Sequence, residues 1–206
     1  MSLIDREIED LRGTASGAVT VGALTYFSSR WLSPRLTRFF EANPGISLRI
    51  EPINSVDMMR SVKVDMAILW GIDGWEGHKS ELLLSLPAVP TASRAVAEQV
   101  RQLGLAEAVR QLPLLGDSSG DLGWRAWHAA AGLPYAPSRS SLTIPDSNSR
   151  VQAVVDGQGI ALWDDLVAPE IDDGTLVRLS DVGVKDAGYR ILFTERPMSQ
   201  SAEAFL

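Results

Sequence analysis

Short apolar segments alternate with segments of helical hydrophobic spacing in the first part of this chain, and this alternation restricts the possible folds most strongly. Strands are predicted at 18–23, 46–50 and 64–70, with helices through 31–40 and 56–62 between them. A turn is predicted at 24–28, and Asn43-Pro44-Gly45 is expected to end the first helix. A β-α-β-α-β order of this kind indicates a parallel sheet with helices on its faces.

The same alternation begins again after Pro87 and Pro90, which predict an extended crossing segment. Strands are predicted at 81–86, 113–116, 141–144, 160–163, 176–179 and 189–194. Helices are predicted at 93–103, in a second helix that follows and ends at 111, and at 121–131, 147–156 and 201–206. Glu195-Arg196-Pro197 predicts a second crossing. Two α/β blocks joined by two crossings favour a hinged pair of lobes, and the alternative is one sheet of six to eight strands.

The composition excludes several classes of protein. The chain has 206 residues, no cysteine and a formal net charge of −7, so disulfides, thiolate nucleophiles and Cys-based metal sites are excluded. Its 19 Lys and Arg residues are scattered, which makes the chain a poor binder of nucleic-acid phosphates. No apolar run approaches the roughly 18 residues needed to cross a bilayer. The charged N-terminal segment does not resemble a signal peptide, so we expect a cytoplasmic protein without a membrane partner.

The sequence offers no convergent set of catalytic or metal-binding residues. His78 and His128 are its only histidines, and each is expected at the surface or behind a site rather than in a Ser-His-Asp triad. The acidic pairs Asp164-Asp165 and Asp172-Asp173 are expected to cap helices or to be solvated. The segment 116–120 lacks the third glycine of a dinucleotide fingerprint. We therefore expect no enzyme, no metal and no cofactor.

Three predicted strand-to-helix turns, at 24–29, 116–120 and 145–149, are rich in small polar side chains. In open α/β sheets, ligands bind beyond the carboxyl ends of the strands, where helix N-termini suit a carboxylate or phosphate. Asp117 and Asp146 could also meet an ammonium group, so an amino-acid-like or peptide-like ligand would use both kinds of partner. The alternative is that Ser28, Asp146 and Ser147 only cap their helices.

Tryptophan is frequent, with six residues in the chain. Trp70 and Trp75 flank the glycine-containing loop 71–77, where they are candidates either for a ligand wall or for packing. Trp163, at the end of a strand in the second block, is a further candidate. The remaining tryptophans occupy helical positions beside other apolar residues and are expected in the core: Trp31, Trp124 and Trp127.

One series of motifs runs through almost the whole chain. It comprises Val19-Thr20-Val21-Gly22-Ala23 and the segments 29–36, 39–46, 64–68, 71–84, 124–133 and 151–162. In order and spacing these motifs resemble the effector-binding domains of LysR-type regulators over 19–206. The loop 71–77 followed by Glu81-Leu82-Leu83-Leu84 is similar to the glycine-cleavage-activator branch of that family, which includes the β-lactamase regulators. The chain departs from the family pattern at 59–63, at Trp70 and at 88–94, so the identity of a ligand does not carry over.

This resemblance implies a periplasmic-binding-protein-like fold of type II, with two Rossmann-like lobes joined by two crossing strands. Lobe I would comprise 18–90 and 195–206, and lobe II would comprise 91–194. Residues 1–17 would hold a cloning remnant and the end of a linker helix. A winged helix-turn-helix would lie upstream, outside this chain, and DNA would be bound only through it.

The resemblance also implies a ligand-sensing domain that binds a small, carboxylate-bearing or amino-acid-like effector between the lobes and assembles with itself into dimers or tetramers. The expected effector contacts are Thr25, Tyr26, Phe27, Ser28, Trp70, Gly71, Asp117, Ser118, Asp146, Ser147, Asn148 and Trp163. One alternative is a solute-binding receptor of a transporter with the same fold, which would need a leader peptide or lipid anchor. Another is a small α/β transferase or lyase.

Overall fold

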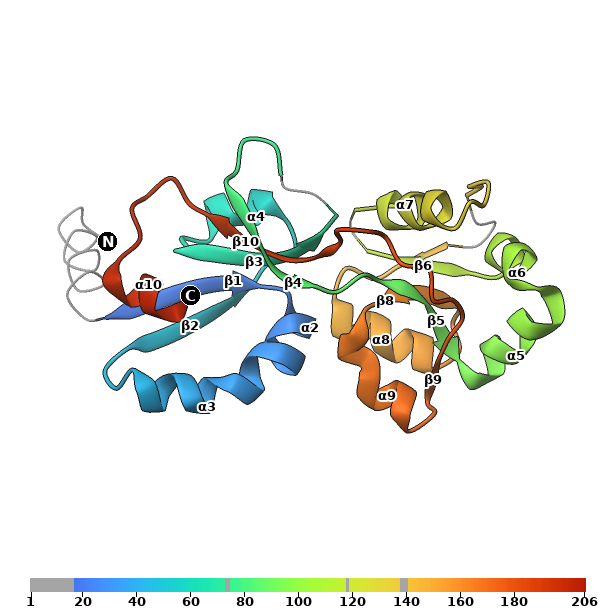
Figure 1. Ribbon diagram of the computed structural model, residues 1–206, viewed down its shortest axis with the longest axis horizontal. Helices are drawn as coiled ribbons and strands as arrows, with labels where there is room; N and C mark the ends of the chain where they lie inside the picture. Colours follow the sequence, from blue (N-terminus) through green and yellow to red (C-terminus); the bar gives the residue numbers. More distant parts are fainter. Residues whose placement is uncertain (1–16, 73–74, 118, 138–140) are drawn as a thin grey trace. The chain divides into compact units, whose positions relative to one another are not determined.

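The computed structural model describes residues 17–72, 75–117, 119–137 and 141–206, which form two five-stranded sheets (Figure 1). The strand order is β2-β1-β3-β10-β4 in the first sheet and β7-β6-β8-β5-β9 in the second. The alternative of one undivided sheet is therefore wrong. The chain divides into two compact units: unit 1 holds the described residues of Met1–Leu69, Gly74–Glu81 and Arg190–Leu206, and unit 2 holds those of Trp70–Asp73 and Leu82–Tyr189.

The first sheet has the predicted parallel β-α-β-α-β start. Its strands are β1 (Ala18–Ala23), β2 (Ser47–Pro52), β3 (Met66–Gly71), β4 (Ser80–Ser85) and β10 (Gly188–Phe193), and its helices include α3 (Ser33–Ala42), α4 (Val56–Ser61) and α10 (Gln200–Phe205). Strand β1 pairs in parallel with both β2 and β3. The connections through α3 and α4 run in opposite directions along the sheet, so right-handed crossovers place the two helices on opposite faces, as Figure 1 shows.

The predicted turn at 24–28 is wrong, because the chain passes from β1 directly into a helix. Helix α2 (Thr25–Phe27) continues through a π-helical turn, η1 (Ser28–Leu32), into α3. The turn is wide because the Ser33 N–H donates to the Ser28 carbonyl, five residues back. This π turn comes just before Pro34, which lacks the N–H that a regular helix would use, and π turns are a common way to accommodate such an interruption.

The second sheet is mixed rather than parallel. Its strands are β5 (Val89–Ser93), β6 (Leu114–Gly116), β7 (Ser141–Thr143), β8 (Ile160–Trp163) and β9 (Leu176–Arg178). Strand β6 is parallel to β7 and β8, whereas β5 is antiparallel to β8 and β9. The segment expected to be only an extended crossing thus enters a fully buried strand at Val89. Pro90 is tolerated there because it lacks only its N–H, and its carbonyl accepts the Leu179 N–H at 2.9 Å.

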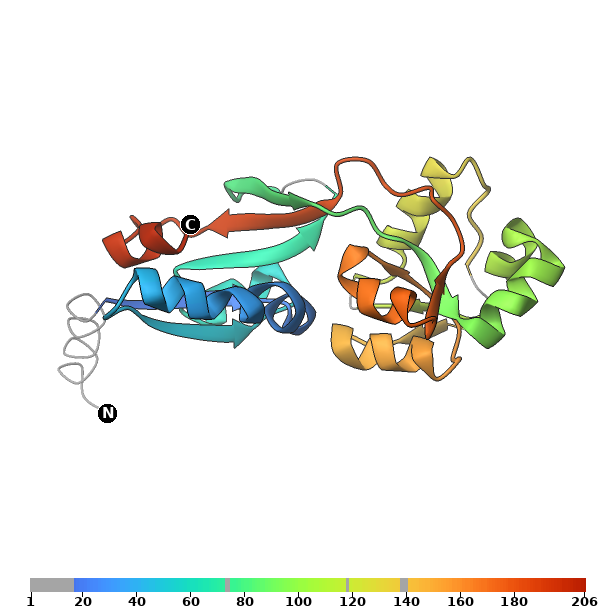
Figure 2. The same cartoon turned by 60° about the horizontal axis from the view of Figure 1, so that its bottom comes forward.

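The helices of unit 2 lie on both faces of this sheet. They are α5 (Arg94–Leu103), α6 (Leu105–Gln111), α7 (Leu122–Ala130), α8 (Ser147–Val155), the 3-10 turn η2 (Asp165–Val167) and α9 (Ala168–Asp172). The connection through α7 runs along the sheet in the opposite direction to those through α8 and α9, so right-handed crossovers place α8 and α9 on one face. Figure 2 shows α8 and α9 side by side. Neither η2 nor α9 was predicted from the sequence.

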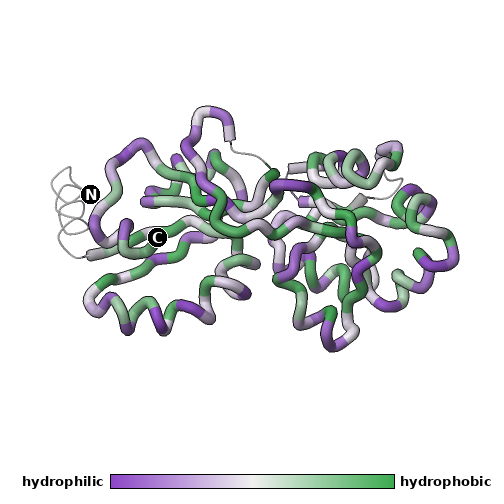
Figure 3. Tube along the Cα trace, viewed as in Figure 1, coloured by the Kyte–Doolittle hydropathy of each residue, from purple (hydrophilic) through white to green (hydrophobic). Residues whose placement is uncertain are grey.

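Each unit has its own hydrophobic core. The core of unit 2 is built around the fully buried Trp127 and includes Trp124 and Ile160, and that of unit 1 includes Ile53, Met59, Val64, Ala67 and Leu192. Helix α3 contains no buried residue, and hydrophilic and hydrophobic residues alternate along it in Figure 3. Among the described residues, no helix combines the length and the apolar character that crossing a membrane requires.

Candidate functional site

The carboxyl ends of three neighbouring strands meet at one edge of the second sheet. Strands β7, β6 and β8 are adjacent and parallel, so the residues that follow Thr143, Gly116 and Trp163 lie at the same edge. This is the edge at which open α/β sheets place their ligands. We call this set of segments the carboxyl edge of unit 2 and define it by Asp117, the segment 144–150 and Trp163.

Asp117 organises the turn after β6. Its Oδ1 accepts the N–H of Ser119 at 2.8 Å and the hydroxyl of the same residue. The Asp117 carbonyl accepts the Gly120 N–H at 3.2 Å, which closes the turn. The Asp117 side chain is 44% exposed, so its carboxylate is accessible although its own turn holds it in place. Ser118, which was also expected to contact the effector, lies outside the described residues.

The second turn begins helix α8 with Asp146, Ser147 and Asn148. Asp146 caps the helix, because its Oδ1 accepts the Ser149 N–H at 2.8 Å. The expectation of N-capping is therefore confirmed for Asp146. Ser147 is the first helical residue rather than the cap and is buried, whereas Asn148 is half-buried. The capped helix start can still favour an anion through its dipole.

Arg150 connects these segments, although it was not among the predicted site residues. Its Nη1 donates to the Ile144 carbonyl at 2.5 Å, and its Nη2 lies 3.4 Å from the Ser147 hydroxyl and 4.0 Å from Asp117 Oδ2. The guanidinium also lies over the Trp163 ring, 4.9 Å from its centroid. One side chain therefore approaches residues at the carboxyl ends of all three strands.

A signal for Arg150 was present in the sequence. The residue lies three positions after Ser147, so both project from one face of α8, on which Val151 and Val154 are buried. An arginine on an otherwise apolar helix face is rarely buried without a polar partner. The spacing alone does not reveal that Arg150 also approaches Asp117 and Trp163, because this depends on which strands are neighbours in the sheet.

Trp163 and Asp164 complete the edge after β8. Trp163 is buried, with 4% of its surface exposed, and its ring supports the Arg150 guanidinium. The buried Asp164 accepts the Leu166 N–H at 3.0 Å and caps η2, and the neighbouring Asp165 pairs with Arg178 at 2.6 Å. The expectation that this acidic pair caps a helix or is solvated is confirmed, because Asp164 caps η2 and the Asp165 side chain is exposed.

The turn expected in unit 1 is instead the start of the helical run after β1. Tyr26 and Phe27 are buried, whereas Thr25 and Ser28 are partly exposed. Ser28 does not cap the helix, because it lies inside the run and its hydroxyl donates back to the Leu24 carbonyl at 3.0 Å. Phe27 stacks on Trp31 with ring centroids 5.0 Å apart.

The two tryptophans that flank the glycine-containing loop have packing partners. Trp70 packs against the core of unit 2, and its indole N–H donates to the Leu86 carbonyl at 3.1 Å. Gly71, the last residue of β3, is half-buried. Trp75 packs against the core of unit 1. Both tryptophans thus have packing partners, which is one of the two alternatives that the sequence offers.

One of the two histidines, His128, is not at the surface. His78 is partly exposed, but His128 is buried within an aromatic cluster with Trp124, Trp127 and Tyr135. The His128 Nδ1 lies 2.8 Å from the Trp124 carbonyl and therefore donates to it. The expectation of a surface position is therefore wrong for His128, whereas a position behind a site stays a prediction. Within the described part of the chain, no three His, Cys, Asp or Glu side chains could hold a metal ion together.

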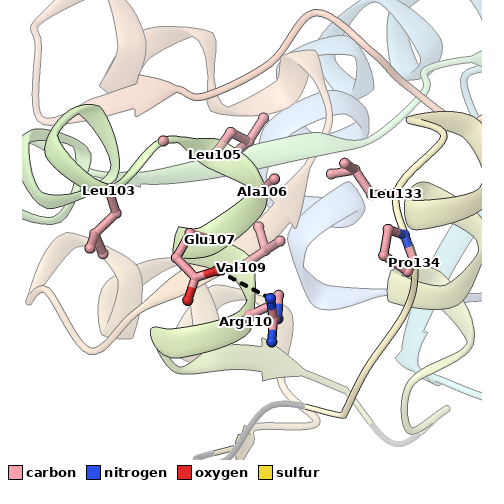
Figure 4. Close-up of a pocket in the computed structure, with 9 residues that line it drawn as sticks. Leu103, Leu105, Ala106, Glu107, Val109, Arg110, Leu133 and Pro134 are labelled. Atoms are coloured by element: carbon pink, nitrogen blue, oxygen red, sulfur yellow. Dashed lines mark hydrogen bonds and ion pairs between the residues drawn. The ribbon is translucent and has the colours of Figure 1, made fainter.

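A separate pocket of about 340 Å³ lies at the corner between α5 and α6 (Figure 4). Its lining is mostly apolar, with Leu103, Leu105 and Leu133 among its residues, and its charged residues Glu107 and Arg110 pair with each other at 3.2 Å. Because the pocket is lined by 103–107, 109–110 and 133–134, it shares no residue with the carboxyl edge of unit 2.

Residues 12–206 match the family described as the LysR substrate binding domain. The glycine cleavage system transcriptional activator of Escherichia coli K12 is 32% identical over 165 residues, which cover 80% of this chain and 54% of that protein. The transcriptional activator AmpR of Rhodobacter capsulatus is 31% identical over 191 residues, or 90% of this chain and 63% of that protein. The chain thus spans about half to two thirds of the length of these relatives.

The effector domain of AmpR from Pseudomonas aeruginosa has the same fold. Its solved structure is similar to this one with a TM-score of 0.79 and 28% sequence identity over 91% of each chain. Together with the two five-stranded sheets, this likeness confirms the predicted type II periplasmic-binding-protein-like fold. By its motifs, its fold and the match over 12–206, this chain belongs to the LysR substrate-binding domain family.

Proposed function

We propose that this chain is the effector-sensing domain of a LysR-type transcription regulator and catalyses no reaction. The relatives reported above are named as transcriptional activators, and the solved relative is named as an effector domain. The observation that carries the proposal is the carboxyl edge of unit 2, where hydroxyl, carboxylate, cationic and aromatic groups meet beyond three parallel strands. Such a set suits reversible binding of a small polar molecule.

The proposed effector bears a carboxylate or resembles an amino acid. The start of α8 favours a negative group through its dipole, and the exposed Asp117 carboxylate favours an ammonium group. In unit 2 the proposed contacts are Asp117, Ser118, Asp146, Ser147, Asn148 and Trp163, together with Trp70 and Gly71. In unit 1 they are Thr25, Tyr26, Phe27 and Ser28.

The proposed mechanism is a shift between two conformations of the regulator. An effector changes the balance only if it binds one conformation more tightly than the other, and typical coupling free energies are about 1–3 kcal/mol. We propose that the domain assembles with copies of itself, works in the cytoplasm, and acts on DNA through a part of the regulator outside this chain. The net charge of −7 supports the last point, because phosphate binding needs clustered cations.

Isothermal titration calorimetry with amino acids, small carboxylates and peptidoglycan fragments tests this proposal. We expect saturable heat from at least one of these compounds. Ser147→Ala should then weaken binding about threefold to tenfold, because one hydrogen bond contributes roughly 0.5–1.5 kcal/mol. Ser61→Ala is the matched control, since Ser61 is exposed on α4. No heat from any compound would contradict the proposal.

A further inference from the structure

We infer that Arg150 selects the effector by binding an anionic group at the carboxyl edge of unit 2, an inference that rests on the proposed function and deepens it. From the sequence, helix starts and hydroxyl groups are the expected partners of the anion. In the structure a guanidinium lies among the same segments, and a guanidinium matches the planar geometry of a carboxylate with two parallel hydrogen bonds.

Arg150 is a buried cation, and such burial is unfavourable, which indicates that its charge has a role in the protein. Only 8% of the residue is exposed, and it shares its face of α8 with the buried Val151 and Val154. Placing a cation in such surroundings costs free energy unless partners compensate for the lost water. The Ile144 carbonyl, the Ser147 hydroxyl and the Trp163 ring provide part of this compensation.

The ion pair of Arg150 differs from those of four other arginines in unit 2. Those arginines approach a carboxylate oxygen within hydrogen-bond distance, at 2.6 Å for Arg101, 3.2 Å for Arg110, 2.8 Å for Arg125 and 2.6 Å for Arg178. The distance from Arg150 to Asp117 Oδ2 is 4.0 Å, which is longer than a hydrogen bond. The most buried of these arginines therefore has the longest of these ion pairs.

The other oxygen of Asp117 is held elsewhere. Its Oδ1 accepts two hydrogen bonds from Ser119, so the turn after β6 fixes the carboxylate where it is. A carboxylate brought by an effector could therefore bind the guanidinium directly, while Asp117 stays in its own turn. An ammonium group on the same molecule would then meet Asp117, which makes a zwitterion the best match.

Amide NMR titration with acetate, with acetamide as the neutral counterpart, tests the role of Arg150 without a known effector. We expect acetate, but not acetamide, to give saturable shifts at the amides of Asp117, Ser119, Ser147 and Ser149. Arg150→Gln should weaken acetate binding at least tenfold, and Arg150→Lys should weaken it less. Arg101→Gln removes the same charge from an exposed pair on α5 and should leave acetate binding unchanged.

A second variant, Asp117→Asn, distinguishes anion binding by Arg150 from a purely structural role of Arg150. It also provides a test if Arg150→Gln does not fold. Removing the negative charge of Asp117 should strengthen acetate binding several-fold if Arg150 binds the anion. If Arg150 only connects the ends of the strands, acetate binding should not become stronger. The inference is overturned if acetate gives no saturable shifts, or if Arg150→Gln binds acetate as the unchanged protein does. A compound that binds both proteins equally in calorimetry would also overturn it while leaving the proposed function intact.

Discussion

Gly159 occupies a backbone conformation that other residues rarely adopt, just before a strand of the candidate site. Its φ is +150°, and it precedes β8, whose last residue is Trp163. A Cβ atom at Gly159 would lie 2.3 Å from the Pro113 carbonyl oxygen and 2.8 Å from Leu115 Cδ1. The Ile160 N–H donates to the same carbonyl at 2.9 Å. The missing side chain thus allows β8 to approach β6 closely.

Gly159→Ala should therefore destabilise the protein by about 2–4 kcal/mol, because backbone strain and overlap with a carbonyl add together. Gly132→Ala is the matched control: its φ is +67°, but a Cβ there would meet no atom within 4 Å, so only about 1 kcal/mol should be lost. Urea unfolding measures both values. Equal losses for the two variants would show that the contact with Pro113 does not matter.

The polar residues of the candidate site were easier to predict one by one than as a group. Asp117, Asp146 and Ser147 follow predicted strands, so the rule for ligand positions in α/β sheets identifies them. Arg150 was not predicted as a site residue, because its contacts depend on the adjacency of three strands that are distant in sequence. The burial of His128 escaped because it depends on Tyr135, which follows helix α7 and packs against its ring.

At the scale of elements, a charged cluster ties the start of α7 to the segment after its end. Asp121 Oδ2 accepts from Arg125 Nε at 2.8 Å and from the Tyr135 hydroxyl at 2.9 Å. The hydrogen bond from Arg125, followed by that from Tyr135, lowers the pKa of Asp121. The Arg125 guanidinium also lies over the Tyr135 ring, 4.6 Å from its centroid. The tyrosine that covers His128 is thus held by an ionised aspartate.

The stabilising effect of this cluster should depend on pH in a defined direction. Because the folded protein lowers the pKa of Asp121, the carboxylate stabilises it above the unfolded value of about 3.9, and this stability is lost as pH falls through the lower folded value. Asp121→Asn should therefore lower the melting temperature at pH 6, and this effect should shrink as the pH falls below about 3.9. Asp181→Asn, at an exposed position, is the control. A difference that stays constant across this pH range would contradict the assignment.

Elements with regular periodicity were predicted well, and those set by tertiary contacts were not. Strands β1 and β8 have the predicted bounds because apolar runs and nearby glycines delimit them. Strand β5 was not predicted, since Pro87 and Pro90 indicate a connection, yet pairing with β8 and β9 makes it a buried strand. Helix α9 was also missed, because it is only five residues long and has no buried residue.

At the scale of the whole molecule, unit 1 is assembled from separate stretches of chain. Strand β10 lies between β3 and β4 in the first sheet, although more than a hundred residues separate it from either. Its Leu192 is fully buried in the core of unit 1. The first sheet therefore needs the last part of the chain to be complete.

Deleting Arg190–Leu206 should consequently abolish cooperative unfolding of unit 1, because it removes most of an internal strand together with α10. Deleting only 200–206 removes α10 and should lower stability while leaving a cooperative transition. Val21 in β1 and Ile68 in β3 belong to unit 1 and to the first sheet, so amide exchange at these two residues, measured by NMR, reports on this sheet. Native-like protection of the first sheet in the longer deletion would contradict the prediction.

The division of the chain into units makes unit 2 an insertion within unit 1, since β1 and α10 both belong to unit 1. A fluorescent protein fused at either end would therefore be anchored to unit 1 and would report only indirectly on a ligand at Asp117 or Arg150. A biosensor that uses a pair of dyes would instead need one dye on each unit. In unit 2 the outward-facing Leu122 on α7 is a suitable attachment point.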